Sequence, residues 1–212
     1  MKKTILSILS LTFIIACKDA KSNDNFIDIE EVNTVETKNK IINTSSEEER
    51  NAKVLITTDV LEETIRTFKN CKATSTKRSD CRNAITEFVS STYKINDFKD
   101  KENNNVIYDS IQSIVSRSSK WNKLGSVTKQ KNIDKALEHT NNGGLALIVD
   151  TSETYGHVVV VLKGEAKNSG SWGLKLPQVL SLTNFSPSKS FHNKSLAYAF
   201  KKSNDLQVFL RK

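Results

Sequence analysis

Two residues of this chain could together carry out nucleophilic chemistry, Cys81 and His157. Cys81 precedes a run whose apolar residues recur at helical spacing, and the partial positive charge of a helix start lowers a thiol pKa and favours the thiolate. His157 follows Gly156 and opens a β-branched run, so we expect a rigid strand to hold its imidazole. An imidazole facing a thiolate is the arrangement that a cysteine nucleophile with a histidine base requires.

The same two residues also have structural interpretations. Cys71 and Cys81 are ten residues apart, and outside the cytoplasm a disulfide could close this loop and stabilise the fold by about 2–3 kcal/mol. A bridged Cys81 would not be a nucleophile. His157, in turn, could be a strand-entry histidine that hydrogen-bonds the backbone. The sequence leaves both alternatives open.

The elements that must position these residues follow from the spacing of apolar side chains. The first expected helix would bury Val60, Ile65 and Phe68, with Asp59 as its N-cap. Two strand segments are almost continuously apolar, which indicates that both faces of their sheet are covered. Helices are expected over Asp59–Lys69, Cys81–Tyr93, Asn104–Ser118 and Lys131–Thr140, and strands over Leu145–Val149, His157–Leu162, Leu174–Leu182 and Leu206–Leu210.

The order of these elements predicts the fold class. Helices come first and strands later, so we expect an α+β domain in which helices pack on an antiparallel sheet. We place this domain at residues 54–212.

The N-terminus has the three parts of an export signal. Lys2 and Lys3 form a positive start, and Ile5–Ile15 is apolar but too short to span a bilayer as a stable helix. The segment Ile14–Cys17 resembles the lipobox of bacterial lipoproteins. This resemblance implies a signal peptide over residues 1–16, a lipid on Cys17 and a location in the cell envelope, anchored to the membrane.

Residues 17–53 comprise the lipidated cysteine and a polar stretch without apolar periodicity, which we interpret as a flexible tether. The chain carries a formal net charge of +8, which could favour an anionic partner such as wall polymer or a lipid surface; solubility is the alternative explanation. No nucleic-acid motif is present, and the three cysteines and three histidines have no zinc-site spacing. We therefore expect no nucleic-acid partner, no metal and no cofactor.

The motifs around the two candidate residues resemble a known family. Cys81 at a helix start, followed downstream by the segment Gly156–Val161, is similar to the papain-like cysteine amidases of the NlpC and CHAP type. The similarity covers roughly Thr58–Arg211 and extends to bacterial envelope amidases, including amidase toxins of type VI secretion. It is carried further by Trp121, Leu124, Gly125, Ala136, Asn142, Gly144, Leu147–Val149, Ser169–Gly173 and Pro177.

The resemblance implies a papain-like fold with Cys81 as nucleophile and His157 as base. Members of the family also orient the imidazole with a third polar residue after the histidine strand, for which Glu165 and Asn168 are the candidates. The implied substrate is an amide bond in the peptide stems of peptidoglycan. The alternative is a catalytically inactive amidase-like lipoprotein that binds wall polymer or a partner protein, with a Cys71–Cys81 disulfide.

Overall fold

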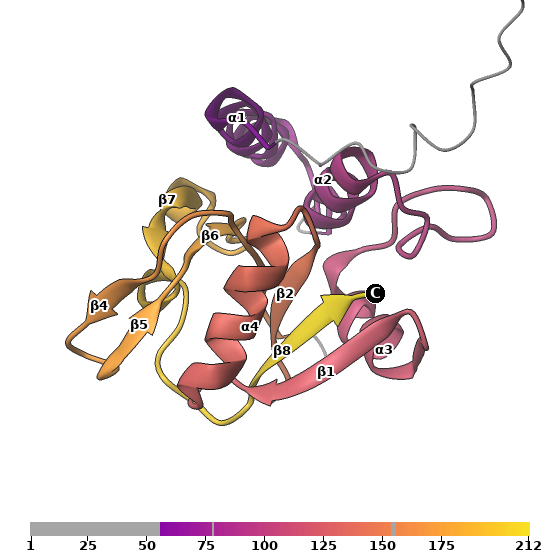
Figure 1. Ribbon diagram of the computed structural model, residues 1–212. Helices are drawn as coiled ribbons and strands as arrows, with labels where there is room; N and C mark the ends of the chain where they lie inside the picture. The colour runs from indigo at the N-terminus through magenta and orange to yellow at the C-terminus, as the bar shows by residue number, and fades with distance from the viewer. Residues whose placement is uncertain (1–55, 78, 154–155) are drawn as a thin grey trace, which may run out of the picture. The chain divides into compact units, whose positions relative to one another are not determined.

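A computed structural model describes residues 56–212 except residue 78 and residues 154–155, and these residues belong to one structural unit. The predicted signal peptide, the predicted lipidation site Cys17 and the predicted tether lie outside the described residues. Six strands form one antiparallel sheet in the order β1-β8-β2-β3-β6-β7, and β4 and β5 form a separate antiparallel pair. The predicted α+β class with an antiparallel sheet is confirmed (Figure 1).

The four α-helices of the described chain all precede β2, and seven of its eight strands follow α4. The α-helices are α1 (Thr58–Thr74), α2 (Ala84–Tyr93), α3 (Ile111–Arg117) and α4 (Gln130–Asn141), and the short 3-10 helices are η2 (Tyr108–Ser110), η3 (Pro187–Lys189) and η4 (Leu196–Tyr198). The strands are β1 (Trp121–Ser126), β2 (Ala146–Asp150), β3 (Val158–Val161), β4 (Lys167–Ser169), β5 (Leu174–Leu176), β6 (Gln178–Ser181), β7 (Phe191–Ser195) and β8 (Leu206–Arg211).

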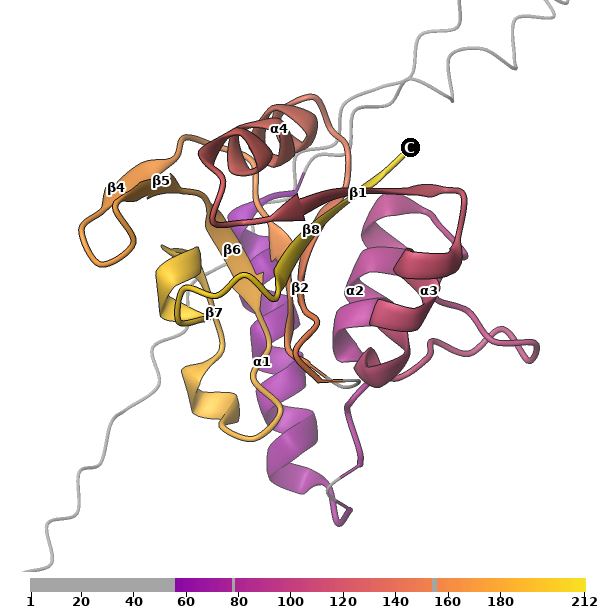
Figure 2. The ribbon, with the colours of Figure 1, turned by 90° about the horizontal axis from the view of Figure 1, so that it is seen from below.

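Helices cover both faces of the large sheet. Successive side chains of a strand point to opposite faces, so Leu147 and Val149 of β2 join the core beneath α1, α2 and α3, while Ala146 and Ile148 join the core beneath α4. Figure 2 shows α4 on one side of the sheet and the other three helices on the opposite side. This explains why β2 and β3 are continuously apolar, as the sequence indicated.

The first helix begins earlier and turns a different face inward than predicted. Thr57, not Asp59, is its N-cap, and the Thr57 hydroxyl accepts a hydrogen bond from the Val60 amide at 3.4 Å. The buried residues of α1 are Leu61, Ile65 and Phe68. Val60 is 42% exposed, so its assignment to the core was wrong. Leu61 takes its place because it lies four residues before Ile65 on the same face.

The second and third predicted helices are shorter than expected. Helix α2 starts at Ala84, and Cys81 lies in the turn before it with φ of 64°. This left-handed backbone conformation cannot continue into a helix. The chain around Asn104 forms a turn with a bridge between Lys99 and Asn105, so the third predicted helix begins only at Tyr108, as η2 followed by α3.

The strands also differ from the prediction. The predicted strand Leu174–Leu182 divides at Pro177 into β5, which pairs with β4, and β6, which pairs with β3 and β7. Proline has no amide hydrogen to donate to a ladder, which suits a break between two pairings. Strands β1, β4 and β7 were not predicted.

A buried carboxylate ties the edge of the sheet to the loop after α2. The side chain of Asp97 is 2% exposed and accepts hydrogen bonds from the Trp121 indole at 3.0 Å and from Arg211 Nε at 3.2 Å. Lys120 Nζ lies 3.5 Å from the same carboxylate. Because Trp121 begins β1 and Arg211 ends β8, this group fixes where the outer strand pair closes on the helices.

Candidate functional site

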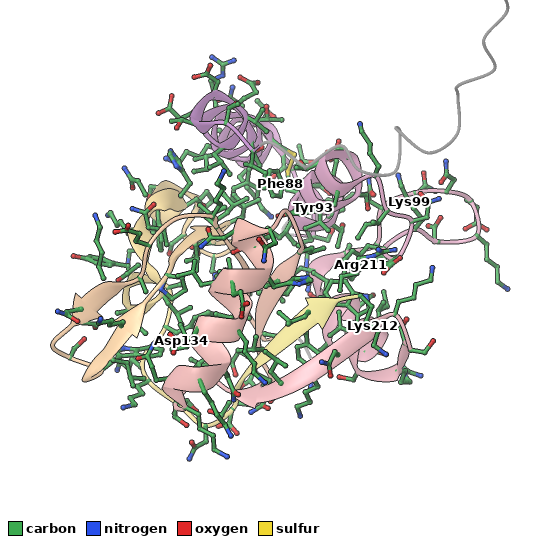
Figure 3. The ribbon with its side chains drawn as sticks, viewed as in Figure 1. Phe88, Tyr93, Lys99, Asp134, Arg211 and Lys212 are labelled. Carbon is green, nitrogen blue, oxygen red and sulfur yellow. A yellow bond between two sulfur atoms is a disulfide. The ribbon has the colours of Figure 1, made fainter. Side chains whose placement is uncertain are left out.

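Cys81 forms a disulfide with Cys71, which lies in the last turn of α1. The two Cα atoms are 6.1 Å apart, within the usual range for a disulfide. The bridge is the sulfur–sulfur bond drawn in yellow between α1 and α2, close to Phe88 (Figure 3). A sulfur in a disulfide is neither a thiol nor a thiolate, so the predicted Cys81 nucleophile is not free in this structure.

The surroundings of Cys81 are those of a packed helix junction. Cys81 and Cys71 line a hollow of about 460 Å³ between α1 and α2, together with Phe68, Phe88 and the methyl-bearing threonines of both helices. Cys81 also packs against the core beneath the helices. The bridge thus braces α1 against the start of α2.

His157 lies directly before β3, as expected, but in a different hollow. Its Nε2 is 2.9 Å from the Ser181 hydroxyl, and its ring packs against Phe200 with centroids 5.3 Å apart. Burial lowers the pKa of His157 to about 4, an effect that the nearby Asp150 carboxylate only partly offsets. The imidazole is therefore neutral at neutral pH and a weaker base than an ordinary histidine.

Gly156 has a steric role beside this histidine. A Cβ at position 156 would lie 2.0 Å from the backbone oxygen of Asp150, at the end of the neighbouring strand β2. Only glycine permits that approach. The Gly-His pair therefore marks a tight entry into the β2–β3 ladder, which also fixes the position of the imidazole.

The predicted third residues do not lie beside His157. Glu165 is exposed in the connection between β3 and β4. Asn168 lies in β4, in the separate two-stranded sheet, and lines a hollow with Gln130 and Asp134 of α4. The residue that holds the imidazole is Ser181 at the end of β6. Among the described residues, neither Glu165 nor Asn168 makes a hydrogen bond to His157, so a role for either in orienting the imidazole stays a prediction.

The hollow that His157 lines is the candidate site of this chain. This His157 cavity has a volume of about 300 Å³, at the lower end of the range for small-molecule sites. Two aromatic residues on its wall are highly exposed, Phe185 at 67% and Tyr198 at 70%. The described residues that line it are Tyr108, His157, Thr183, Asn184, Phe185, Lys189, Tyr198 and Ala199.

One polar group of the cavity lacks a partner. The side-chain oxygen of Asn184 is buried and accepts no hydrogen bond from the described residues. Leaving a buried acceptor unsatisfied costs about 1–3 kcal/mol. The loop that carries it is well fixed, since the amide of Thr183 donates to the Ser190 hydroxyl at 2.9 Å. Asn184 thus brings a buried, unpaired acceptor to the wall of the cavity.

Arg82 and Tyr108 connect the His157 cavity to the disulfide junction, which comprises Cys71, Cys81 and the facing side chains of α1 and α2. The Tyr108 amide donates to the carbonyl of Arg82 at 2.9 Å, and the Arg82 guanidinium lies 4.9 Å from the centre of the Tyr108 ring. Tyr108 lines the cavity. Cys81 is not among the described residues that line it, so the structure does not bring the predicted Cys81–His157 pair into one cavity.

Within the described part of the chain, no cluster of three or more histidine, cysteine or acidic side chains has the geometry to hold a metal ion. Among the same residues, no helix combines the length and the apolar character needed to cross a bilayer.

Comparison with protein-family models and with curated proteins finds no match to this chain.

Proposed function

We propose that this chain is a lipid-anchored module of the bacterial cell envelope that binds wall polymer without cutting it. The observation that carries the proposal is the Cys71–Cys81 disulfide, which leaves no thiol at the residue that hydrolysis would need. The neutral His157, held by Ser181 rather than by a carboxylate, supports the same conclusion. The lipobox-like segment ending at Cys17 supports the anchor and the envelope location.

The proposed function agrees with the resemblance to papain-like amidases if this chain is a relative that has lost the catalytic activity. Helix α2 follows Cys81 closely and His157 precedes a central strand of an antiparallel sheet, as the resemblance implies. In this proposal the His157 cavity binds a wall component, while Cys81 joins α1 to the start of α2 through the disulfide. The positive net charge favours association with an anionic polymer.

The test uses the mature lipoprotein in detergent micelles, incubated with purified cell-wall sacculi under non-reducing conditions. We expect the protein to sediment with the sacculi and to release no soluble stem-peptide fragments, as measured by chromatography of the supernatant. Release of such fragments by the unreduced protein, together with its loss in a Cys81→Ala variant, would contradict a purely binding function.

A second candidate function, peptidoglycan amide hydrolysis, is favoured by the contact between Arg82 and Tyr108. That contact places the chain next to Cys81 against the wall of the His157 cavity. Reduction by a dithiol would restore the Cys81 thiol while the dithiol becomes a disulfide. Cys81 and His157 line different hollows in the disulfide-bonded form, so Cys81 would have to move to within hydrogen-bond reach of His157 once the bridge is broken. The thiol proton would then pass to His157, the thiolate would attack the amide carbonyl, and backbone amides near Cys81 would stabilise the oxyanion. The protonated His157 would return its proton to the leaving amine, and water would then hydrolyse the thioester.

A pair of variants separates this candidate from the binding function. Cys71→Ser leaves Cys81 unpaired without any reductant, whereas Cys81→Ser removes the thiol. If the chain is a latent hydrolase, Cys71→Ser releases stem-peptide fragments from sacculi and Cys81→Ser does not, with or without dithiol. If neither variant releases fragments and both still sediment with sacculi, the hydrolase candidate is excluded and the binding function stands.

A further inference from the structure

From the lining of the His157 cavity, we infer that it binds one N-acetylated sugar ring, with the acetamido group directed to Asn184 and the ring placed against Tyr198. The inference rests on the proposed function for its source, a wall glycan, and makes a separate claim about the chemistry of the ligand. Three features of the cavity carry it: its exposed aromatic side chains, its unpaired acceptor and its charge.

Tyr198 forms an exposed aromatic surface at the cavity. Tyr198 is 70% exposed, yet it is held in place, because its ring meets the edge of Phe191 at 6.5 Å and Lys194 Nζ lies 5.4 Å from its centroid. Its neighbour Leu196 is fully buried and anchors η4. A fixed, exposed aromatic ring offers an apolar face with a polar tip. The C–H face of a pyranose ring matches such a surface.

The side-chain oxygen of Asn184 favours a ligand that carries a hydrogen-bond donor. The Asn184 oxygen is buried without a hydrogen bond from the described residues, so a rotation of the side chain that turns this oxygen to a ligand N–H or O–H relieves the cost of its burial. An acetamido N–H is a donor of this kind. The hydroxyl of Thr183 and the imidazole of His157 line the same space and suit sugar hydroxyls, but they do not suit an acyl chain.

The charge and the volume of the cavity limit the chemical class of the ligand further. Among the described lining residues, none carries a carboxylate, and Lys189 is the only one with a full charge at neutral pH, because burial keeps His157 neutral. A quaternary ammonium ligand, which exposed aromatic rings would otherwise suit, has no counter-charge here. The volume of about 300 Å³ accommodates a single substituted ring rather than an oligomer, and the charge of the lining favours a neutral or anionic ring.

The experiment titrates the mature lipoprotein in micelles with N-acetylglucosamine and, in parallel, with glucose, which lacks the acetamido group. Binding is followed by NMR shifts of the His157 imidazole and the Tyr198 ring. We expect N-acetylglucosamine to shift both sets of resonances and to bind at least tenfold more tightly than glucose, as one buried hydrogen bond permits. Equal affinity for the two sugars, or no shift at either residue, would overturn the inference.

Matched variants locate the site. Asn184→Ala and Tyr198→Ala should each weaken N-acetylglucosamine binding about tenfold or more, while Tyr198→Phe, which keeps the ring, and Asn193→Ala, an exposed asparagine of β7 outside the cavity, should retain it. Folding of each variant is checked by its amide NMR spectrum. A loss in Asn193→Ala equal to that in Asn184→Ala would contradict the assignment.

Sedimentation with sacculi separates the two proposals. If the parent and both alanine variants sediment equally well, the wall-binding function stands and the sugar site is wrong. If N-acetylglucosamine binds at the cavity but the parent protein does not sediment with sacculi, the sugar site stands and the wall-binding function is wrong.

Discussion

The disulfide junction and the His157 cavity contain the two residues best suited to chemistry, but the fold uses them differently. At the junction, Cys81 is covalently bound and packed between α1 and α2 beside Phe88. At the cavity, His157 lies beside exposed aromatic rings and an unpaired acceptor. The first region has the features of a stabilising contact and the second those of a ligand site. A reactive residue type therefore does not by itself identify a site; its surroundings do.

The sharpest contrast between the regions is expected from their phenylalanines. Phe88 is 4% exposed in the core beneath the helices, so Phe88→Ala should lower the free energy of unfolding by about 3–5 kcal/mol. Phe185 at the cavity is 67% exposed. Phe185→Ala should therefore change the free energy of unfolding by about 0.5 kcal/mol or less. Urea unfolding of both variants measures the difference. Equal losses would mean that the cavity wall is also part of the structural core.

The pH dependence of stability should report the burial of His157. Its pKa is about 4 in the folded protein and about 6.5 when unfolded. Between these values the unfolded chain binds more protons, so stability is full above pH 6.5 and falls as the pH drops to 4, by an amount on the order of 3 kcal/mol. A His157→Gln variant should lose less over this window in urea unfolding at both pH values. An identical loss in parent and variant would contradict the assigned burial.

Removal of the disulfide should have an effect on stability alone. In a Cys71→Ser, Cys81→Ser double variant, the free energy of unfolding should be lower by about 2–3 kcal/mol. The reason is that the unfolded chain regains the conformational entropy that the disulfide removes by closing a loop over a sequence separation of 10. Its binding to sacculi should match that of the parent. If binding is lost while the amide NMR spectrum shows a folded protein, the junction has a direct role in recognition.

The smallest stability effect is expected at the rim of the cavity. Tyr198→Ala removes a side chain that is 70% exposed and should change the free energy of unfolding by less than about 0.5 kcal/mol. Thermal unfolding followed by circular dichroism measures this change. A loss above 1 kcal/mol would show that the fold needs this ring, and would weaken the argument that the ring serves a ligand.

The sequence predicted the elements whose apolar pattern is local. Helices α1 and α4 and strands β2, β3 and β8 lie close to their predicted positions, because a helical stripe or a β-branched run is visible within the segment itself. Strand β1 was missed because its sequence, Trp121–Ser126, is mostly polar. It becomes a strand by pairing with β8, more than eighty residues later in the chain.

The candidate site was less predictable for the same reason. That Ser181 would meet His157 depends on the register of β3 against β6, in which Val159 pairs with Ser181. No local pattern encodes this register. The disulfide was foreseen as an alternative, but nothing in the residue spacing decides between a free and a bridged Cys81. The left-handed backbone at Cys81, which makes the predicted helix begin only at Ala84, has no sequence signal of the kind that a glycine provides.

A peptide map of the purified protein, alkylated under denaturing conditions without a reductant, tests directly whether Cys81 is bridged. We expect Cys71 and Cys81 to appear in one disulfide-linked species, and neither to carry the alkylating group until a reductant is added. Alkylated Cys81 in the unreduced protein, accompanied by release of stem peptides from sacculi that Cys81→Ala abolishes, would contradict this expectation.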